Sequence, residues 1–575
     1  MFNSLFRTKS ISKIISDAAV TEESTHGPGL HRVLTVRDLT FFGIAAIIGA
    51  GSFSSMGSAV ASGGPGVIYL FIICGIACGF TAMCYAEFAS RIPVAGSAYT
   101  YAYASFGEVI AWIIGWALLM EYSIGNIYVA FAWSDYFTNL LESMGINLPG
   151  WLTTNYTAAK DAFVANNAGE VLNAWNTSPV VAGLHIIFDM PALLINILIT
   201  WLVYRGVKES RNVSNVMVLI KLAVVLLVIV VGAFYINTSN WTPVNDAGVR
   251  SFLPNGFAGV MAGVSAVFFA YIGFDAVSTM AEESKNPQRD LPKGMIYSLV
   301  ICTVVYILLS LVLTGMANYK QLAVGDPLAE VFKINNVRWM EVLISICAVA
   351  AMTSVMLVFQ LGQPRIWMSM SRDGLLPRQF QKIHPKYKTP SFSTIVTGLV
   401  VGVPILFTDE RFVLDFTSIG TLFAFVLVCG GVLLIPRKEK QAGKFQMPFV
   451  NAKFIYPTII VLAIVLLAAF RPTYFNELLN ADFVDHTADQ LANNFFFQTA
   501  TLKVTTIIFW LVSIVLSIFA FRKKLSLIPL LGLTTCLYLL TGMSASNWAW
   551  FFAWFGLGLV IYLLYGRRKS KLARE

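Results

Sequence analysis

The sequence predicts an all-α protein that crosses a membrane with about fourteen helices of roughly 20 apolar residues each. Three observations predict this fold class. Hydrophobic residues make up 57% of the 575 residues and charged residues only 12%, against about 25% in soluble domains. The apolar residues are gathered into long runs, and Lys and Arg fall mainly in the segments between them. A surface that faces lipid accounts for all three observations.

The apolar runs place the expected membrane helices in order along the chain. The fourth, ninth, eleventh and thirteenth runs are short for a bilayer span. Between the third and fourth lies the longest expected loop, a polar external segment. The expected helices are 39–61, 67–90, 107–137, 190–206, 212–236, 256–281, 295–317, 339–363, 393–408, 413–435, 454–470, 502–521, 525–541 and 547–565.

The distribution of Lys and Arg predicts the orientation of these helices. If the N-terminus is cytoplasmic and the loops alternate, most of the 40 basic residues are cytoplasmic. This bias is the positive-inside rule, and it places both termini in the cytoplasm. Because the basic residues serve topology, the net charge of +9 does not indicate a nucleic-acid partner. The expected external basic residues are Lys160, Arg250, Lys320, Lys333, Arg338, Arg411, Arg471 and Lys503.

The ends of the chain and its cysteines add little beyond this topology. Residues 1–38 are polar and contain no apolar leader, so the first membrane helix is expected to act as the insertion signal. All seven cysteines lie within apolar runs and none forms a CxxC pair. We therefore expect them to be small apolar fillers, with no disulfide and no metal site.

Two of the expected helices carry glycine near mid-membrane. Gly49 and Gly51 flank Ala50 in the first, and Gly273 precedes Asp275 in the sixth. Glycine interruptions in the first and sixth of ten helices are typical of two inverted five-helix repeats whose breaks face each other at the midplane. The glycines would equally serve close helix packing. Their spacing alone leaves both interpretations open.

An interrupted helix offers a binding chemistry that suits an amino acid. The second half of such a helix begins with free N–H groups, which attract an anion. The first half ends with free carbonyls, which attract a cation. Two breaks side by side would bind a carboxylate and an ammonium together without any charged side chain.

Longer stretches around these breaks resemble the cationic amino acid transporter family of the amino acid–polyamine–organocation superfamily. The stretches cover most of residues 35–435. They are IGAGSF and GGPGVI within 47–68, CYAEFASRIPVAGSAYTYAYASFGE at 84–108, VKESRNVSNVMVLIKL at 207–222, FFAYIGFDAVSTMAEESKNPQRDLP at 268–292, LTGM at 313–316 and LGQPRIWMSMSRDGLLP at 361–377.

The resemblance implies a domain organisation. It comprises a cytoplasmic N-terminal segment (1–38), a first repeat of helices 1–5 (39–236), a second repeat of helices 6–10 (256–435), four additional helices (454–565) and a basic cytoplasmic tail (566–575).

The same resemblance implies roles for individual residues. The amides around Ala50, Gly51 and Ser52 would hold the substrate carboxylate. Phe274 would be an aromatic gate over the site. Relatives often carry threonine or serine at position 50, so alanine removes a hydroxyl contact and keeps the amide. The carbonyls that would hold the ammonium belong to Ile47, Phe269, Ala270 and Ile272.

Lys221 is the expected proton carrier. A lysine inside a membrane helix is costly and indicates a function, although it could also snorkel to the interface. In proton-coupled members that this sequence resembles, a fifth-helix lysine occupies the place where sodium binds in sodium-coupled relatives. Thr353 and Ser354 match the eighth-helix side of that site.

Two carboxylates in the expected core have open roles. Glu121, near the centre of the third helix, would face the substrate side chain, pair with another polar residue, or be a buried hydrogen-bonded glutamate. Asp275 would bond the broken backbone ends or couple to the gate.

These features together predict a secondary active amino acid transporter of the cell membrane, and not an enzyme. No ATP-binding loop, HExxH or G-x-S-x-G motif is present, and no cofactor is expected. We predict proton-coupled symport by alternating access, with an exchanger or a non-transporting sensor as alternatives. The expected partners are an amino acid, protons and the bilayer, and for the last four helices a small membrane protein or a second copy of the chain.

Overall fold

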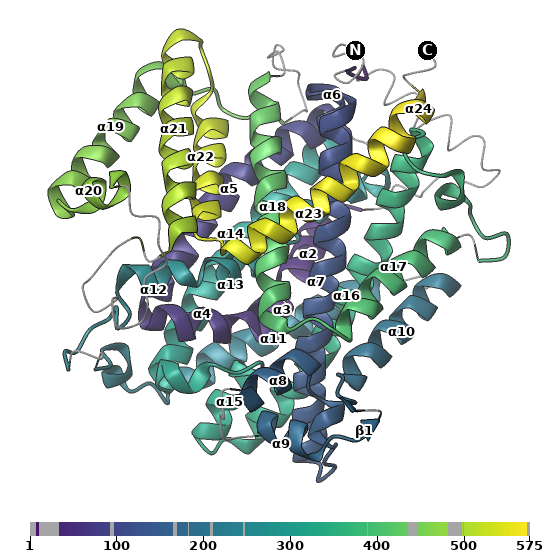
Figure 1. Cartoon of the computed structure of the whole chain (residues 1–575), viewed down its shortest axis with the longest axis vertical. Helices are drawn as coiled ribbons and strands as arrows, with labels where there is room; N and C mark the ends of the chain where they lie inside the picture. The colour runs from purple at the N-terminus through teal and green to yellow at the C-terminus, as the bar shows by residue number, and fades with distance from the viewer. Residues whose placement is uncertain are drawn as a thin grey trace.

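The computed structural model is a bundle of helices whose two chain ends lie at the same side (Figure 1). We call the side with the chain ends the terminal face and the opposite side the far face. The described residues are 7–10, 34–92, 97–164, 170–181, 183–206, 211–244, 248–387, 389–434, 445–480, 497 and 499–571.

Each of the fourteen expected ranges contains helix. Eight helical segments are long and apolar enough to cross a membrane, and five apolar helices are shorter. The protein is therefore a helical membrane protein with many passes. The segments of the first half are α2 (Val36–Ile47), α3 (Ala50–Phe53), α4 (Ser55–Gly63), η2 (Gly64–Gly66), α5 (Val67–Arg91), α6 (Ser97–Ser105), α7 (Glu108–Ser143), α10 (Met190–Arg205) and α11 (Arg211–Ala233).

The second half of the chain also begins with an interrupted helix and continues with longer ones. Its segments are η4 (Thr238–Trp241), α12 (Gly256–Ala262), α13 (Val264–Phe269), η5 (Phe274–Glu283), α14 (Pro287–Met316), η6 (Tyr319–Leu322), α15 (Pro327–Ile334), α16 (Arg338–Arg372), η7 (Arg378–Gln381), α17 (Ser391–Ile405), α18 (Glu410–Leu434), α19 (Ala452–Phe470), α20 (Tyr474–Leu479), α21 (Ala500–Arg522), α22 (Leu527–Thr541), α23 (Ala545–Ile561), η9 (Tyr562–Gly566) and α24 (Arg567–Lys569).

The segment expected as a long polar loop contains regular structure. The third membrane helix, α7, continues to Ser143 on the far face. Beyond it lie η3 (Gly150–Leu152), α8 (Tyr156–Val164), α9 (Glu170–Thr177) and a two-stranded antiparallel hairpin, β1 (Val180–Val181) with β2 (Leu184–His185). The composition predicted that this segment is polar, but it did not predict the short helices within it.

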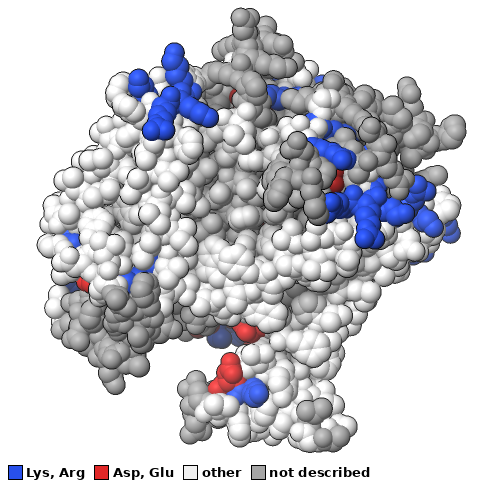
Figure 2. All heavy atoms as spheres, turned by 45° about the horizontal axis from the view of Figure 1, so that its top comes forward, with Lys and Arg blue, Asp and Glu red and all other residues white. Residues whose placement is uncertain are grey.

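The distribution of side chains fits a lipid environment. Large apolar side chains on the outer helices are exposed, including Val461 on α19 and Leu511 on α21. Since these helices are apolar on their outer faces as well, lipid is the medium that covers them. Most of the Lys and Arg side chains visible in Figure 2 lie in its upper half, and the flank below them is nearly free of charge.

The two ends of the chain meet on the terminal face in a set of contacts that we call the terminal clasp. Lys9 forms an ion pair with Asp373, just after α16, with 3.1 Å between Nζ and Oδ1. Glu108, the first residue of α7, accepts hydrogen bonds from Tyr562 at 2.9 Å and from Ser570 at 2.5 Å. The clasp thus ties both termini to core helices.

Candidate functional site

The first membrane helix is interrupted between α2 and α3. Ile48 leaves the helical conformation with a ψ of 99°, and α3 starts again at Ala50. Gly49 lies in this gap, and its carbonyl accepts from the amides of Ser52 and Phe53, both at 3.0 Å. The first N–H groups of α3 have no partner within their own helix, as at any helix start. The predicted break is present at the predicted glycines.

The second break lies between α13 and η5. Gly273 has a φ of 113°, a left-handed conformation that favours glycine. After it the chain forms ten residues of 3₁₀-helix and not the α-helix we expected. A 3₁₀ stretch of this length inside a membrane helix is typical of a strained or hinge region. The Asp275 carboxyl lies within hydrogen-bonding reach of the backbone amides of Gly273 and Ala276.

The two breaks touch each other through their backbones. A Cβ atom on Gly51 would lie 2.5 Å from Ala270 Cα, and one on Gly273 would lie 2.9 Å from the Ala46 carbonyl carbon. Glycine is therefore required at both points for the two segments to approach this closely. The close packing and the interruption, which the sequence left as alternatives, are both present at these residues.

The residues expected to bind substrate line this contact and are buried. The backbone amide of Ser52 is one of those expected to bind the substrate carboxylate, and it already donates a hydrogen bond to the Gly49 carbonyl. The side chain of Ala50 lies outside the described residues. Among the expected ammonium-binding carbonyls, Ile47 accepts a hydrogen bond of 2.9 Å from the Tyr306 hydroxyl. The buried members of the expected set are Ile47, Gly51, Ser52, Phe269, Ala270, Ile272 and Phe274.

Aromatic rings surround the second break. The ring of Phe274 lies 5.2 Å from that of Phe425 on α18 and 6.0 Å from that of Tyr85 on α5, measured between centroids. The ring of Phe269 lies 4.5 Å from that of Tyr128 on α7. Phe274 is thus held in an aromatic cluster beside the breaks. Its role as a gate stays a prediction.

Glu121 on α7 is buried, with 2% of its surface exposed. Its Oε2 atom has no hydrogen-bond partner among the described residues. A buried carboxyl oxygen without a partner is costly. One oxygen of the Glu121 carboxyl is therefore unsatisfied in the core, although the carboxyl also lies within hydrogen-bonding reach of Thr421.

Lys221 on α11 is also buried, with 3% of its surface exposed. Its Nζ donates a hydrogen bond to the hydroxyl of Ser354 on α16. The two residues that the resemblance paired are therefore in contact. Thr353 is not part of this contact, because its hydroxyl accepts from Trp133 at 2.9 Å. Thr353 thus links α16 to α7, and its expected role beside Lys221 stays a prediction.

A hydrogen-bonded chain that the sequence did not predict runs from the far face toward the breaks. The Ser54 hydroxyl donates to Glu410 at 3.1 Å and lies 3.0 Å from the Tyr128 hydroxyl. Tyr128 in turn contacts Phe269. The one sequence signal for this contact was the charged residue Glu410 at the start of an apolar helix. A charged residue at a helix end is usually exposed to solvent, so this signal did not indicate a buried hydrogen bond.

The described residues contain no group of three His, Cys, Asp or Glu side chains able to hold a metal ion. The seven cysteines are all free, and all except the half-buried Cys347 are buried.

Comparisons of the sequence with known proteins identify related transport proteins. A profile of the amino acid permease family matches residues 34–480, and a profile of the C-terminus of these permeases matches residues 525–570. The branched-chain amino acid permease BcaP of Bacillus subtilis is 41% identical over 78% of this chain and 89% of its own. The methylthioribose transporter of the same bacterium is 40% identical over the same shares. The chloroplastic cationic amino acid transporter 9 of Arabidopsis thaliana is 38% identical over 76% of this chain and 72% of its own.

Proposed function

Because this chain belongs to the amino acid permease family, we propose that it is a secondary active transporter that carries an amino acid together with a proton. The observation that supports this most directly is the contact between the two helix breaks at Gly51 and Ala270. The contact brings helix-start amides and helix-end carbonyls together in the core. This is the chemistry needed for the carboxylate and ammonium of an amino acid.

We propose an apolar substrate side chain, such as a branched-chain one. The walls beside the breaks are apolar and aromatic, with Ile272, Phe269 and Phe274 all buried. The name of the Bacillus subtilis permease BcaP points the same way. Glu121, whose carboxyl oxygen lacks a partner, would suit a cationic side chain instead. Arginine is therefore the necessary competitor in any assay.

In the proposed mechanism Lys221 carries the proton. Its ammonium is buried and donates to Ser354 on α16, while α11 also packs against α2. Loss of the proton would weaken this link between helices of the two proposed repeats. That would allow the inverted repeats, 39–236 and 256–435, to move against each other in alternating access.

An exchanger without proton coupling is the second candidate. The same Lys221–Ser354 contact supports it, because a permanently charged lysine could simply hold the two helices together. The two functions differ in whether a proton gradient drives uptake.

The test uses the purified full chain in liposomes with radiolabelled leucine, arginine and alanine, and with methylthioribose as a fourth substrate. We expect an imposed proton gradient, inside alkaline, to raise leucine uptake more than tenfold. Lys221→Ala should abolish this stimulation and retain exchange of leucine across the membrane. No transport of any amino acid would contradict the proposal, as would preferred transport of methylthioribose.

The matched control is Lys503→Met. Lys503 is a lysine of α21 with 3% of its surface exposed, and it donates to the Asn480 carbonyl at 3.0 Å. Its removal should leave proton stimulation unchanged, even if it lowers the melting temperature. If Lys221→Ala retained full proton stimulation, a proton carrier other than Lys221 would replace the proposed mechanism. If a proton gradient did not stimulate uptake by the unmodified chain, the exchanger would replace it.

A further inference from the structure

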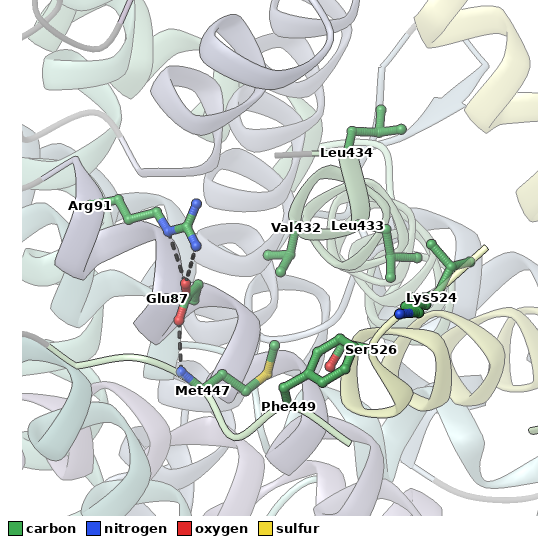
Figure 3. Close-up of a pocket in the computed structure, with 10 residues that line it drawn as sticks. Glu87, Arg91, Val432, Leu433, Leu434, Met447, Phe449, Lys524 and Ser526 are labelled. Carbon is green, nitrogen blue, oxygen red and sulfur yellow. Dashed lines mark hydrogen bonds and ion pairs between the residues drawn. The ribbon is translucent and has the colours of Figure 1, made fainter. Parts of the chain in front are cut away.

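A cavity of about 260 Å³ is lined by residues at the ends of several helices, none of which belongs to the helix breaks (Figure 3). It lies between the ends of α5 and α18, the segment before α19 and the turn between α21 and α22. A single water needs only about 10–15 Å³ of such space, so the cavity holds several groups of that size. This is enough for a phosphate group with its glycerol, and too little for a whole lipid.

The polar side of the cavity is cationic. Arg91 forms an ion pair with Glu87, at 2.6 Å between Nη2 and Oε1, and the second oxygen of Glu87 accepts from the Met447 amide at 2.7 Å. Both oxygens of Glu87 are therefore occupied from within the protein. Lys524, at the rim, is exposed and forms no ion pair with a carboxylate of the described residues. An incoming anion would thus meet an excess of positive charge.

The wall also offers a hydroxyl. Ser526 lines the cavity, and its Oγ is buried without a hydrogen-bond partner among the described residues. A buried hydroxyl is expected to find an acceptor. A rotation of the Ser526 side chain would turn this hydroxyl toward a phosphate bound beside Lys524, because Lys524 and Ser526 are two residues apart on the same turn.

The other side of the cavity is apolar and continues to the lipid-facing surface. Val432, Leu434 and Phe449 line it, and the side chains of Leu434 and Phe449 are exposed on the outer surface. A ligand that fits both sides needs an anionic head and an apolar body.

We infer that this cavity binds the phosphate headgroup of an anionic phospholipid in the leaflet at the terminal face. Basic pockets between membrane helices are typical sites for such headgroups. By the positive-inside rule this is the cytoplasmic leaflet. The inference does not depend on which substrate the protein carries.

The test measures lipid binding to the purified full chain by native mass spectrometry in detergent. The probes are phosphatidylglycerol, phosphatidylcholine with the same acyl chains, and glycerol 3-phosphate as a headgroup without chains. We expect phosphatidylglycerol to bind at least tenfold more tightly than the other two. Equal binding of phosphatidylcholine would overturn the inference, and equal binding of glycerol 3-phosphate would identify a soluble phosphate as the ligand instead of a lipid.

Variants then locate the site. Lys524→Ala, Ser526→Ala and the cavity-filling Val432→Trp should each weaken phosphatidylglycerol binding about tenfold. The matched control is Lys523→Ala, because Lys523 is an exposed lysine on the same turn that lies against the Phe519 ring and does not line the cavity. An equal loss with Lys523→Ala would show that only the general surface charge attracts the lipid, and would overturn the inference.

Discussion

Gly51 has no room for a side chain, because its missing Cβ would fall 2.5 Å from the backbone of Ala270. We expect Gly51→Ala to push the two breaks apart and to lower substrate uptake more than tenfold, with the protein still folded. Binding of leucine to purified protein and uptake into liposomes would measure this effect.

Gly79 provides the control for this substitution. It lies within α5, and a Cβ there would meet nothing within 4 Å. Gly79→Ala should leave uptake unchanged and raise stability slightly, since alanine is the better helix former. Equal losses from both substitutions would mean that the contact at Gly51 has no special role.

Asp326 gives the far face a pH-dependent stability. It lies at the start of α15 and accepts a hydrogen bond of 2.7 Å from Asn139. Burial, with a contribution from the charge of Glu330, raises the pKa of Asp326 to about 6, from about 3.9 in an unfolded chain. Between these values the folded protein holds more protons than the unfolded one. The contribution of Asp326 to the free energy of unfolding is therefore fully present below about pH 4, and it is lost as the pH rises through 6.

Replacing this carboxyl should flatten that part of the stability profile. We expect Asp326→Asn to reduce the fall in melting temperature between pH 4 and pH 6, by an amount worth at most about 3 kcal/mol. Thermal unfolding in detergent at a series of pH values measures it. Asp161→Asn, at an exposed position on α8, should leave the profile as it is. A profile identical in wild type and Asp326→Asn would contradict the expectation.

At the scale of elements, the helix breaks were the most predictable feature. Gly49, Gly51 and Gly273 are local signals, because a glycine inside an apolar run is costly without a reason. The 3₁₀ conformation of η5 was not predictable, since its residues do not differ in pattern from those of an α-helix.

Contacts between distant residues were beyond sequence reasoning. The Ser54–Glu410 hydrogen bond joins residues 356 apart, and the Ser570–Glu108 bond joins residues 462 apart. Neither has a local pattern. The Lys221–Ser354 contact joins residues 133 apart, and it was expected only because the resemblance to proton-coupled relatives placed these two positions at one site.

The terminal clasp should stabilise the fold more than an exposed ion pair does. Lys9 and Asp373 are largely buried, and Tyr99 also donates to Asp373 at 2.6 Å. Lys9→Ala leaves that carboxylate without its cation, so we expect a loss of about 1–3 kcal/mol in the free energy of unfolding. Denaturant or thermal unfolding of the purified protein measures it.

Lys333→Ala is the comparison. Lys333 pairs with Glu330 at 3.6 Å, and 54% of its side chain is exposed. Exposed pairs contribute about 0–1 kcal/mol. If the two substitutions cost the same, the clasp would be no more than a surface contact.

At the scale of the whole molecule, the last four membrane helices separate into two kinds. α23 is part of the main core, where the Trp554 and Trp116 rings stack with centroids 4.8 Å apart. α19 and α21 form their own small apolar cluster around Tyr456 and Leu530. α22 joins the two groups, because its first half lies in this cluster and its Cys536 and Leu539 lie in the main core. The sequence could not divide them this way, because helices that are apolar all round give no sign of which face is buried.

The placement of both termini in the cytoplasm rests on charge alone and can be tested on intact cells. Lys160 is exposed on α8, which lies at the far face (Figure 1), and Lys386 is exposed in the loop that joins η7 to α17. With a membrane-impermeant maleimide, Lys160→Cys should be labelled on intact cells, and Lys386→Cys only after permeabilisation. The unmodified chain gives the background, which should be low because six of its seven cysteines are buried and Cys347 is half-buried. The reverse labelling pattern would show that the positive-inside rule fails here, and it would move the proposed lipid site to the external leaflet.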